Sequence, residues 1–256
     1  MTISSKGNVL ITGAAQRIGA AIASAMSADG WTVGIHYFQS SGAANALCDD
    51  LNNLNANAYV VGADLSDDRA VQGMISQAAV HGPVTCLINN ASIFERDDLH
   101  SVTRASWQTH MNVNLWAPLC LSQTFAAALP IGAEGNIVNI VDQRVDKISP
   151  DFLSYTISKT GLWNLTQSLA LTLAPSIRVN AIGPGPVLPS PRQSNEQFSL
   201  QASRMPLGQG APVIEIADCV RYILSTTSMT GQLIFLDGGQ HLGWDLPDPG
   251  SPPITE

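Results

Sequence analysis

Short apolar runs alternate with longer segments of helical spacing along most of the chain. The runs are rich in valine, isoleucine and leucine, as expected for strands that are buried on both faces of a parallel sheet. We predict strands at residues 8–12, 32–38, 57–63, 84–90, 136–142, 177–183 and 232–239. The segments 18–30, 41–54 and 67–79 have the spacing and small residues of helices. This alternation predicts an α/β fold with a Rossmann-type doubly wound parallel β-sheet of about seven strands.

Two segments depart from this alternation. Residues 184–212 follow the sixth predicted strand and are rich in proline, serine and glutamine. A long insertion beyond the carboxyl end of a strand is where a doubly wound fold keeps a mobile substrate loop. Residues 246–256 are proline-rich and are expected to form a disordered tail. Residues 1–245 contain no internal repeat and are predicted to form a single domain.

The composition indicates a folded chain with a large core. Of its 256 residues, 45% are hydrophobic and 12% are charged. The net charge is −8 and the basic residues are scattered, so we expect no nucleic-acid partner. The N-terminus lacks the long apolar segment of a secretory signal. The four widely spaced cysteines have apolar neighbours, which predicts buried reduced thiols in a cytoplasmic protein.

Two long stretches, residues 112–133 and 160–177, carry no charge. Prolines interrupt the first, and amide and hydroxyl side chains interrupt both, so we expect no membrane span. Helices so poor in charge favour burial against other helices, including those of another subunit.

The first predicted strand leads directly into TGAAQRIG, residues 12–19. A glycine-bearing turn between a strand and a helix lets the backbone approach a pyrophosphate at the helix N-terminus. Such turns are common, but here the strand, the turn, the helix and the N-terminal position all agree. We therefore predict a dinucleotide cofactor held by Gly13, Arg17, Ile18 and Gly19.

The second predicted strand ends in HYFQSS, residues 36–41, which contains no acidic residue. An NAD site usually has an acid here for the ribose hydroxyls, whereas a 2′-phosphate favours cations and hydroxyl donors. Arg17, with Ser40 or Ser41, supplies these groups, so NADPH is the predicted cofactor. The alternative is that Arg17 is a solvated residue at a helix start, although a cation there is unfavourable without an anion nearby.

Tyr155 and Lys159 stand four residues apart in SYTISK, on one face of a predicted helix. Tyrosine becomes an effective acid near neutral pH when a nearby cation lowers its pKa. Lys159 can supply that cation and can also hold ribose hydroxyls. The spacing is common by chance and gains specificity from the N-terminal turn.

Taken together, these motifs resemble the short-chain dehydrogenase/reductase family over nearly the whole chain. Further matches are ADL at 63–65, NNAS at 89–92, NVNLWAP at 112–118, RVNAIGPG at 178–185 and FLDGG at 235–239.

The family resemblance also implies roles for residues in these motifs. Asp64 and Leu65 would flank the adenine, and Asn90 and Ala91 would line the cofactor ribose. Pro184 and Gly185 would border the nicotinamide. Asn114 would hold a water in a proton relay to Lys159.

Two departures from the family pattern are more informative than the matches. Arg17 replaces the middle glycine of the usual turn, and Asp142 occupies the place of the catalytic serine, thirteen residues before Tyr155. In both departures the chain resembles the pteridine reductases and bacterial dihydromonapterin reductases. The segments HYF at 36–38 and NNASIF at 89–94 are similar to this subgroup as well. One mismatch is Gln39, where this subgroup often has an arginine.

The subgroup resemblance implies a pterin-like small-molecule substrate. Phe94 would stack on the pterin ring, with Ser92 and Arg17 beside it, while His36 and Tyr37 would contact the cofactor. It also implies a homotetramer, in which the C-terminus can reach a neighbour's site through His241 or Trp244.

A carboxyl group at position 142 suits such a substrate. A serine hydroxyl polarises a ketone oxygen, whereas reduction of a pterin C=N bond requires a proton at a ring nitrogen, which Asp142 and Tyr155 can deliver. Asp142 can also accept hydrogen bonds from an amino-pyrimidine edge. The predicted activity is therefore hydride transfer from NADPH to a dihydropterin, with Asp142, Tyr155, Lys159 and Asn114 as the catalytic group.

Three alternatives stay open. Asp142 can mark a degenerate site, although the retained Asn114, Tyr155 and Lys159 argue against it. The chain can be an ordinary carbonyl or 3-oxoacyl reductase of the same fold. It can also be a non-catalytic, NADPH-binding regulatory protein, although no appended domain is apparent.

Other polar residues carry no clear chemistry. The five histidines lack ligand spacing and are expected at the surface or at strand ends, so no metal site is predicted. Glu95, Asp97 and Asp98 are expected to form a solvated loop.

Overall fold

The computed structural model describes residues 6–190 and 192–243. Within these residues, seven parallel strands form one sheet in the order β3-β2-β1-β4-β5-β6-β7. The strands are β1 (Asn8–Ile11), β2 (Thr32–Tyr37), β3 (Asn57–Gly62), β4 (Val84–Asn89), β5 (Gly135–Ile140), β6 (Ile177–Pro184) and β7 (Leu233–Leu236). This topology confirms the predicted Rossmann-type doubly wound sheet.

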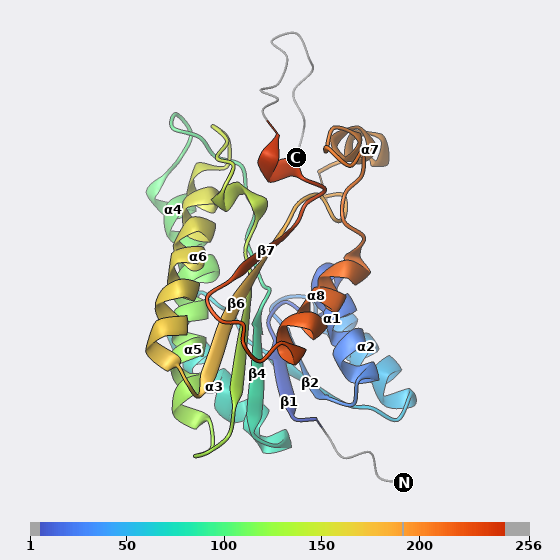
Figure 1. Cartoon of the computed structure of the whole chain (residues 1–256), viewed down its shortest axis with the longest axis vertical. Coiled ribbons are helices and arrows are strands. Elements are labelled where there is room, and N and C mark those ends of the chain that lie inside the picture. Colours follow the sequence, from blue (N-terminus) through green and yellow to red (C-terminus); the bar gives the residue numbers. More distant parts are fainter. Residues whose placement is uncertain (1–5, 191, 244–256) are drawn as a thin grey trace.

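Helices cover both faces of the sheet (Figure 1). One side carries α1 (Arg17–Ala28), α2 (Ser41–Asn53) and α8 (Val213–Ser225). The other side carries α3 (Asp68–Ala78), α4 (Arg104–Met111), α5 (Ala117–Ala128) and α6 (Leu153–Leu173). Short helical turns are η1 (Ala79–His81), the π-helical η2 (Asn112–Trp116), η3 (Gln143–Val145) and η4 (Gln240–Leu242).

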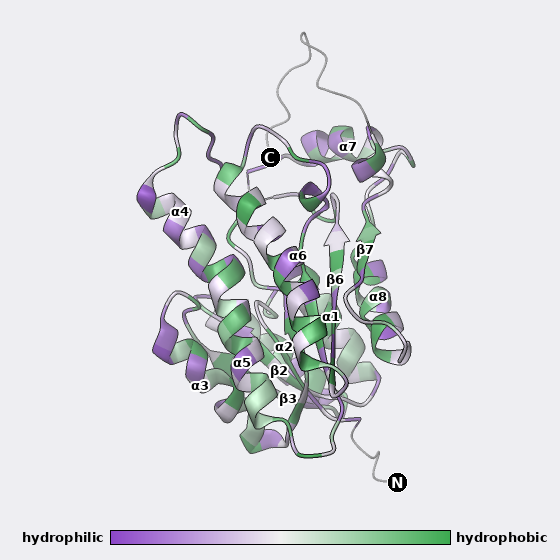
Figure 2. Ribbon diagram, turned by 60° about the vertical axis from the view of Figure 1, so that its left-hand side comes forward, coloured by the Kyte–Doolittle hydropathy of each residue, from purple (hydrophilic) through white to green (hydrophobic). Residues whose placement is uncertain are grey.

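The sheet separates two hydrophobic cores. Val9, Ile11 and Ile35 pack toward α1 and α8, whereas Leu10 and Leu87 point to the side of α3 and α5. Neighbouring residues of β1 therefore fill opposite cores, which explains why this strand is apolar at every position except its first. Figure 2 shows the hydrophobic residues along the strands and along the inner sides of the helices.

The strand order reverses between β1 and β4, since β2 and β3 lie on one side of β1 and the later strands on the other. In doubly wound folds, ligands bind beyond the carboxyl ends of the strands at such a switch point. Segment 184–212 also lies beyond these ends, at the top of Figure 1, and includes the helix α7 (Asn195–Ser203). This segment was predicted as a loop, and helix α7 within it was not predicted; α7 begins with a capping box formed by Ser194 and Gln197.

Two strands end two or more residues before their predicted ends. Strand β5 ends at Ile140 rather than at 142, and Asp142 instead caps η3 by accepting a hydrogen bond from the backbone N–H of Arg144. Strand β7 ends at Leu236 rather than at 239, because Gly238 and Gly239 adopt left-handed backbone angles.

The uncharged stretches belong to η2, α5 and α6. Within the described ranges, no helix has the length and apolar character needed to cross a bilayer. The predicted tail 246–256 and Trp244 lie outside the described residues.

Candidate active site

A cavity of about 840 Å³ lies at the carboxyl ends of β1, β2 and β4. Its volume is in the range of small-molecule and cofactor sites. Twelve residues of the predicted site line it: Gly13, Arg17, Ile18, Gly19, His36, Tyr37, Ser40, Asp64, Leu65, Asn90, Ala91 and Ser92. The structure thus gathers the predicted cofactor residues of the first three βα turns and of the β4 end around one space.

The glycine turn is tightly packed at the base of this cavity. Gly13 has a φ of +62°, and a Cβ on Gly19 would clash with the carbonyl oxygen of Gly13. Asn90 donates hydrogen bonds from its side chain to the carbonyls of Thr12 and Gly13. Both glycines are therefore required for the close approach between the turn, α1 and the end of β4.

His36 supports the turn from beneath. Its Nδ1 accepts a hydrogen bond from the Gly13 N–H at 2.9 Å, and its Nε2 lies 3.2 Å from the carbonyl oxygen of Ala63. The ring is buried, and this desolvation lowers the pKa of His36 to about 4 against the opposing effect of the Ala63 bond. His36 is thus a neutral structural support that also lines the cavity.

Arg17 lies between the large cavity and a smaller one, and lines both. Its backbone has a φ of +56°, a left-handed conformation that favours glycine, the residue usual at this position in the family motif. Its guanidinium donates hydrogen bonds to the carbonyls of Leu188 and Pro189 in the segment 184–212. In this structure Arg17 therefore contacts the loop rather than Ser40, the predicted partner around a 2′-phosphate.

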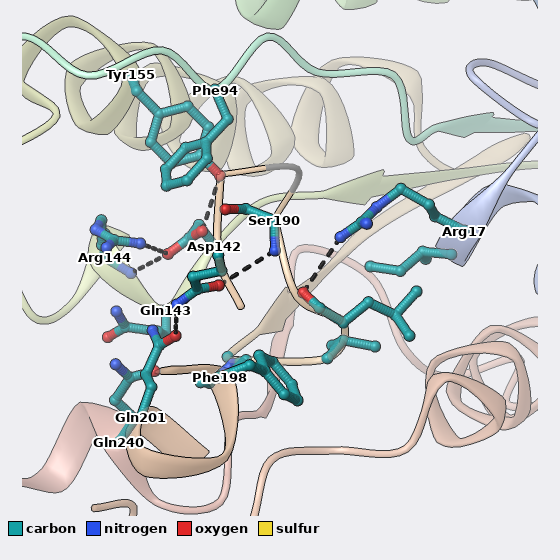
Figure 3. Close-up of a pocket in the computed structure, with 16 residues that line it drawn as sticks. Arg17, Phe94, Asp142, Gln143, Arg144, Tyr155, Ser190, Phe198, Gln201 and Gln240 are labelled. Atoms are coloured by element: carbon teal, nitrogen blue, oxygen red, sulfur yellow. Dashed lines mark hydrogen bonds and ion pairs between the residues drawn. The ribbon is translucent and has the colours of Figure 1, made fainter. Parts of the chain in front are cut away.

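The smaller cavity, about 180 Å³, holds the predicted chemistry (Figure 3). Of the predicted residues, Arg17, Ile18, Phe94, Asp142, Tyr155 and Gly185 line it. Four glutamines with no predicted role also line it: Gln143, Gln193, Gln201 and Gln240. Isolated glutamines in loops give no sequence signal, because their convergence depends on the fold.

Asp142 and Tyr155 form a direct pair in this cavity. The Tyr155 hydroxyl donates to Asp142 Oδ2 at 2.8 Å. The other carboxylate oxygen, Oδ1, accepts from the Arg144 N–H at 2.8 Å and lies 3.6 Å from Arg144 Nη1. Asp142 is thus a hydrogen-bond acceptor held between a phenol and a guanidinium.

Lys159 is almost completely buried, at 2% exposure. Its Nζ donates to the carbonyl oxygen of Ile140 at 2.8 Å and lies 5.9 Å from the centre of the Tyr155 ring. Burial lowers the pKa of Lys159 to about 8, although the charge of Asp142 acts in the opposite direction. Lys159 and Asp142 therefore approach Tyr155 from helix α6 and from the end of β5.

Asn114 lies in the π-helical turn η2 and is fully buried. Its Oδ1 accepts from the Ile93 N–H, and its Nδ2 donates to the carbonyl of Ile93 and to Ser158 Oγ. Asn114 thereby connects the β4 loop to helix α6. The predicted water relay to Lys159 stays a prediction.

Phe94 packs beside the Asp142–Tyr155 pair. Its ring stacks on Phe152 with centroids 4.4 Å apart and meets Tyr155 edge-on at 4.6 Å. Ser92, predicted to lie beside the pterin ring, lines the larger cavity. Asn114, Lys159 and Pro184 line neither cavity, since the first two are buried behind the site and Pro184 ends β6.

Some predictions about individual polar residues were wrong. Asp97 is buried at 4% exposure rather than solvated, because it caps helix α6 through the Ser154 N–H. His110 is 1% exposed within α4 rather than at the surface.

Cys86, Cys120 and Cys219 are buried as expected, whereas Cys48 is only half-buried. Among the described residues, no cluster of histidine, cysteine or carboxylate side chains could hold a metal ion.

His241 is placed by interactions within its own chain. Its ring stacks on Phe235, and its Nδ1 lies 2.8 Å from Asp237 Oδ2. Whether it reaches a neighbouring subunit stays a prediction.

Comparison with known proteins places the chain in a family. The family described as "Enoyl-(Acyl carrier protein) reductase" matches residues 13–241. L-xylulose reductase of Mesocricetus auratus is 32% identical over 238 residues, covering 90% of this chain and 94% of that protein.

Two solved structures are also similar over most of their length. FolM alternative dihydrofolate reductase 1 from Brucella canis, complexed with NADP, is 46% identical, with 96% and 98% of the two chains covered and a TM-score of 0.92. A blue fluorescent protein from a metagenomic library, in complex with NADPH, is 30% identical, with 92% and 98% covered and a TM-score of 0.85. The chain belongs to the short-chain dehydrogenase/reductase family and is an oxidoreductase.

Proposed function

We propose that the chain reduces a dihydropterin to a tetrahydropterin at the expense of NADPH. The observation that carries this proposal is the 2.8 Å hydrogen bond from Tyr155 to Asp142, at the position where the family usually has serine. The similarity to an alternative dihydrofolate reductase complexed with NADP supports the same substrate class.

The residues around the larger cavity fit NADPH. Close glycine packing at Gly13 and Gly19 leaves the start of α1 open to a pyrophosphate. Asp64 and Leu65 line the part expected for the adenine, and Asn90 and Ala91 the part expected for the ribose. At the end of β2 the lining residues are Tyr37, Phe38, Gln39 and Ser40, which place no carboxylate against a 2′-phosphate. When bound, the nicotinamide supplies the hydride.

The chain's own residues then handle the substrate and the proton. Phe94 offers an aromatic surface for a planar ring, held in place by Phe152. Tyr155 holds a proton that it shares with Asp142, and this pair can deliver it to a ring nitrogen at the cavity. Arg144 keeps the Asp142 carboxylate oriented toward Tyr155, and the buried Lys159 places a second cation near the phenol.

A substrate panel tests this proposal. NADPH oxidation is followed with dihydromonapterin, dihydrobiopterin and dihydrofolate, and in parallel with L-xylulose and a 3-oxoacyl thioester. Turnover of at least one dihydropterin is expected. Robust reduction of the ketones with no turnover of any pterin would reject the proposal.

A carbonyl reductase is the second candidate, because L-xylulose reductase is 32% identical over most of the chain. A purely cofactor-binding protein is a third, and the metagenomic blue fluorescent protein in complex with NADPH is similar too. NADPH binding measured by fluorescence, with no turnover in the panel and no effect of Tyr155→Phe, would favour this third reading.

A further inference from the structure

A network of buried, hydrogen-bonded side chains lies behind Tyr155 and has no part in the chemistry described so far. Asp97 follows β4, His110 lies in α4, and Ser154 lies in the first turn of α6. Their exposures are 4%, 1% and 0%. Buried polar groups are costly unless each is satisfied, so their arrangement is informative.

Asp97 caps the helix that carries Tyr155 and Lys159. Its Oδ1 accepts from the Ser154 N–H at 3.0 Å, and its backbone carbonyl accepts from the Leu153 N–H at 3.2 Å. Phe152, the residue in the helix's own N-cap position, has a left-handed backbone and no capping hydrogen bond from its side chain. The cap of α6 is therefore supplied by Asp97, which lies 55 residues before Phe152 in the sequence.

The hydrogen bonds of this cluster run in one direction. The Glu95 N–H donates to His110 Nε2 at 3.2 Å, so the ring proton is on Nδ1. Nδ1–H then donates to Ser154 Oγ at 2.8 Å and to the Ser106 carbonyl at 2.9 Å. The Ser154 hydroxyl in turn donates to Asp97 Oδ2. A fixed backbone donor at one end and a carboxylate at the other set the direction of every bond between them.

Two members of this network are next in sequence to the two aromatic residues, Phe94 and Tyr155, that line the smaller cavity. Glu95 directly follows Phe94, and Ser154 directly precedes Tyr155. The His110 ring also meets the Tyr155 ring edge-on, with centroids 6.3 Å apart. We propose that Asp97, Ser154 and His110 are positioning residues that hold Phe94 and Tyr155 in register with each other. This inference rests on the proposed function, because it assigns Tyr155 the proton and Phe94 the substrate ring.

The substitution Asp97→Asn tests the direction of the hydrogen bonds in this network. The amide can still accept from the Ser154 N–H, but its NH₂ group faces Ser154 Oγ as a donor. The Ser154 hydroxyl must then donate its proton to His110 Nδ1 instead of to residue 97. The ring proton of His110 moves to Nε2, where it faces the Glu95 N–H, so that two donors oppose each other. The substitution therefore disrupts the network at Glu95, beside Phe94, although the side chain keeps its shape.

Asp67→Asn is the matched control. Asp67 caps helix α3 by accepting from the N–H groups of Arg69 and Ala70, and lines neither cavity. We expect kcat for the dihydropterin to fall by about ten- to a hundredfold in Asp97→Asn, as misplacement of reacting groups does elsewhere. The KM for NADPH is expected to stay within about twofold of wild type, and Asp67→Asn to leave kcat unchanged. Equal kcat values in all three proteins would overturn the proposal.

Imidazole ¹⁵N NMR of the protein without cofactor gives a readout that is independent of activity. With His110→Gln to assign the signal, wild type is expected to show the proton on His110 Nδ1, and Asp97→Asn to lose this state. A proton on Nε2 in wild type would overturn the proposal. Absence of pterin turnover in wild type would reject the proposed function, whereas the NMR result would still decide the network.

Ser154→Ala is the second variant, for the case in which Asp97→Asn does not fold. It keeps the backbone hydrogen bond to Asp97 and removes only the hydroxyl between Asp97 and His110. The same fall in kcat is expected with NADPH affinity retained. Wild-type kcat in a folded Ser154→Ala would overturn the positioning role.

Discussion

At the scale of single residues, the site depends on two substitutions of the family pattern that act in different ways. Asp142 replaces a hydroxyl by an acceptor that holds the Tyr155 proton. Arg17 replaces a glycine and keeps the left-handed backbone that glycine would adopt. The chain thus tolerates local backbone strain at a position that lines both cavities, which is where strain is commonly retained for function.

Arg17→Gly and Arg17→Ala separate the backbone effect from the side-chain effect. Both remove the guanidinium and its bonds to Leu188 and Pro189, but only glycine relaxes the φ of +56°. We expect Arg17→Gly to be more stable than Arg17→Ala by about 1 kcal/mol in urea unfolding. Both should raise the KM for the dihydropterin or for NADPH by about tenfold or more, as loss of a charged hydrogen bond does. Equal stability of the two variants would show that residue 17 is unstrained.

Lys159 makes stability depend on pH in a defined window. Its pKa of about 8 in the folded protein lies below the ordinary 10.5. Between these values the unfolded chain binds a proton that the folded chain has released, so the free energy of unfolding rises with pH. Below pH 8 the buried ammonium lowers stability in full. The rise corresponds to about 3 kcal/mol from this group.

Urea unfolding at several pH values checks this expectation. Lys159→Met should lack the rise between pH 8 and 10.5, while the titrations of other groups are common to both proteins. The same pH dependence in wild type and variant would contradict the assignment.

At the scale of elements, the segment 184–212 is attached to the rest of the site by two arginines. Arg17 contacts its Leu188 and Pro189 carbonyls from α1. From within the segment, Arg192 donates to the Phe94 carbonyl and to Glu95 Oε2. The loop therefore connects Arg17, which lines both cavities, with the segment after β4 that carries Phe94.

Arg192→Ala should loosen this attachment. We expect the KM for the dihydropterin to rise several-fold with the KM for NADPH unchanged, and chymotrypsin to cleave faster near Phe198. Arg96→Ala is the control, since Arg96 forms a similarly exposed ion pair with Asp151. Equal proteolysis of both variants would argue against a role for Arg192 in holding the loop.

At the scale of the whole molecule, the sheet follows from sequence because its central strands are largely buried and form plain apolar runs, while the edge strands β3 and β7 are only partly buried. Gly13 and Gly19, predicted to hold the cofactor, were identified for a similar reason, since their turn is local. The links among Asp97, His110 and Ser154, and the convergence of the four glutamines on the smaller cavity, depend on contacts between distant segments. An aspartate next to other acids looks solvated in sequence, and only the position of α6 shows that Asp97 is a cap.

The predicted homotetramer belongs to this scale too. Helices α5 and α6 carry long uncharged stretches, along which Figure 2 shows hydrophobic residues, and Leu171 of α6 is 85% exposed. Light scattering is expected to give four times the mass of one chain, and Leu171→Asp to give a smaller species. A monomer in wild type would contradict the tetramer.

Replacement of Asp142 by serine is the most direct test of the claim that the chain reduces a dihydropterin. The measurement is kcat/KM for a dihydropterin and for a ketone such as L-xylulose, in wild type and in Asp142→Ser. We predict that wild type prefers the dihydropterin and that Asp142→Ser loses pterin turnover while gaining ketone reduction. Wild type that prefers the ketone, or Asp142→Ser with an unchanged preference, would contradict a pterin reductase built on the Asp142–Tyr155 pair.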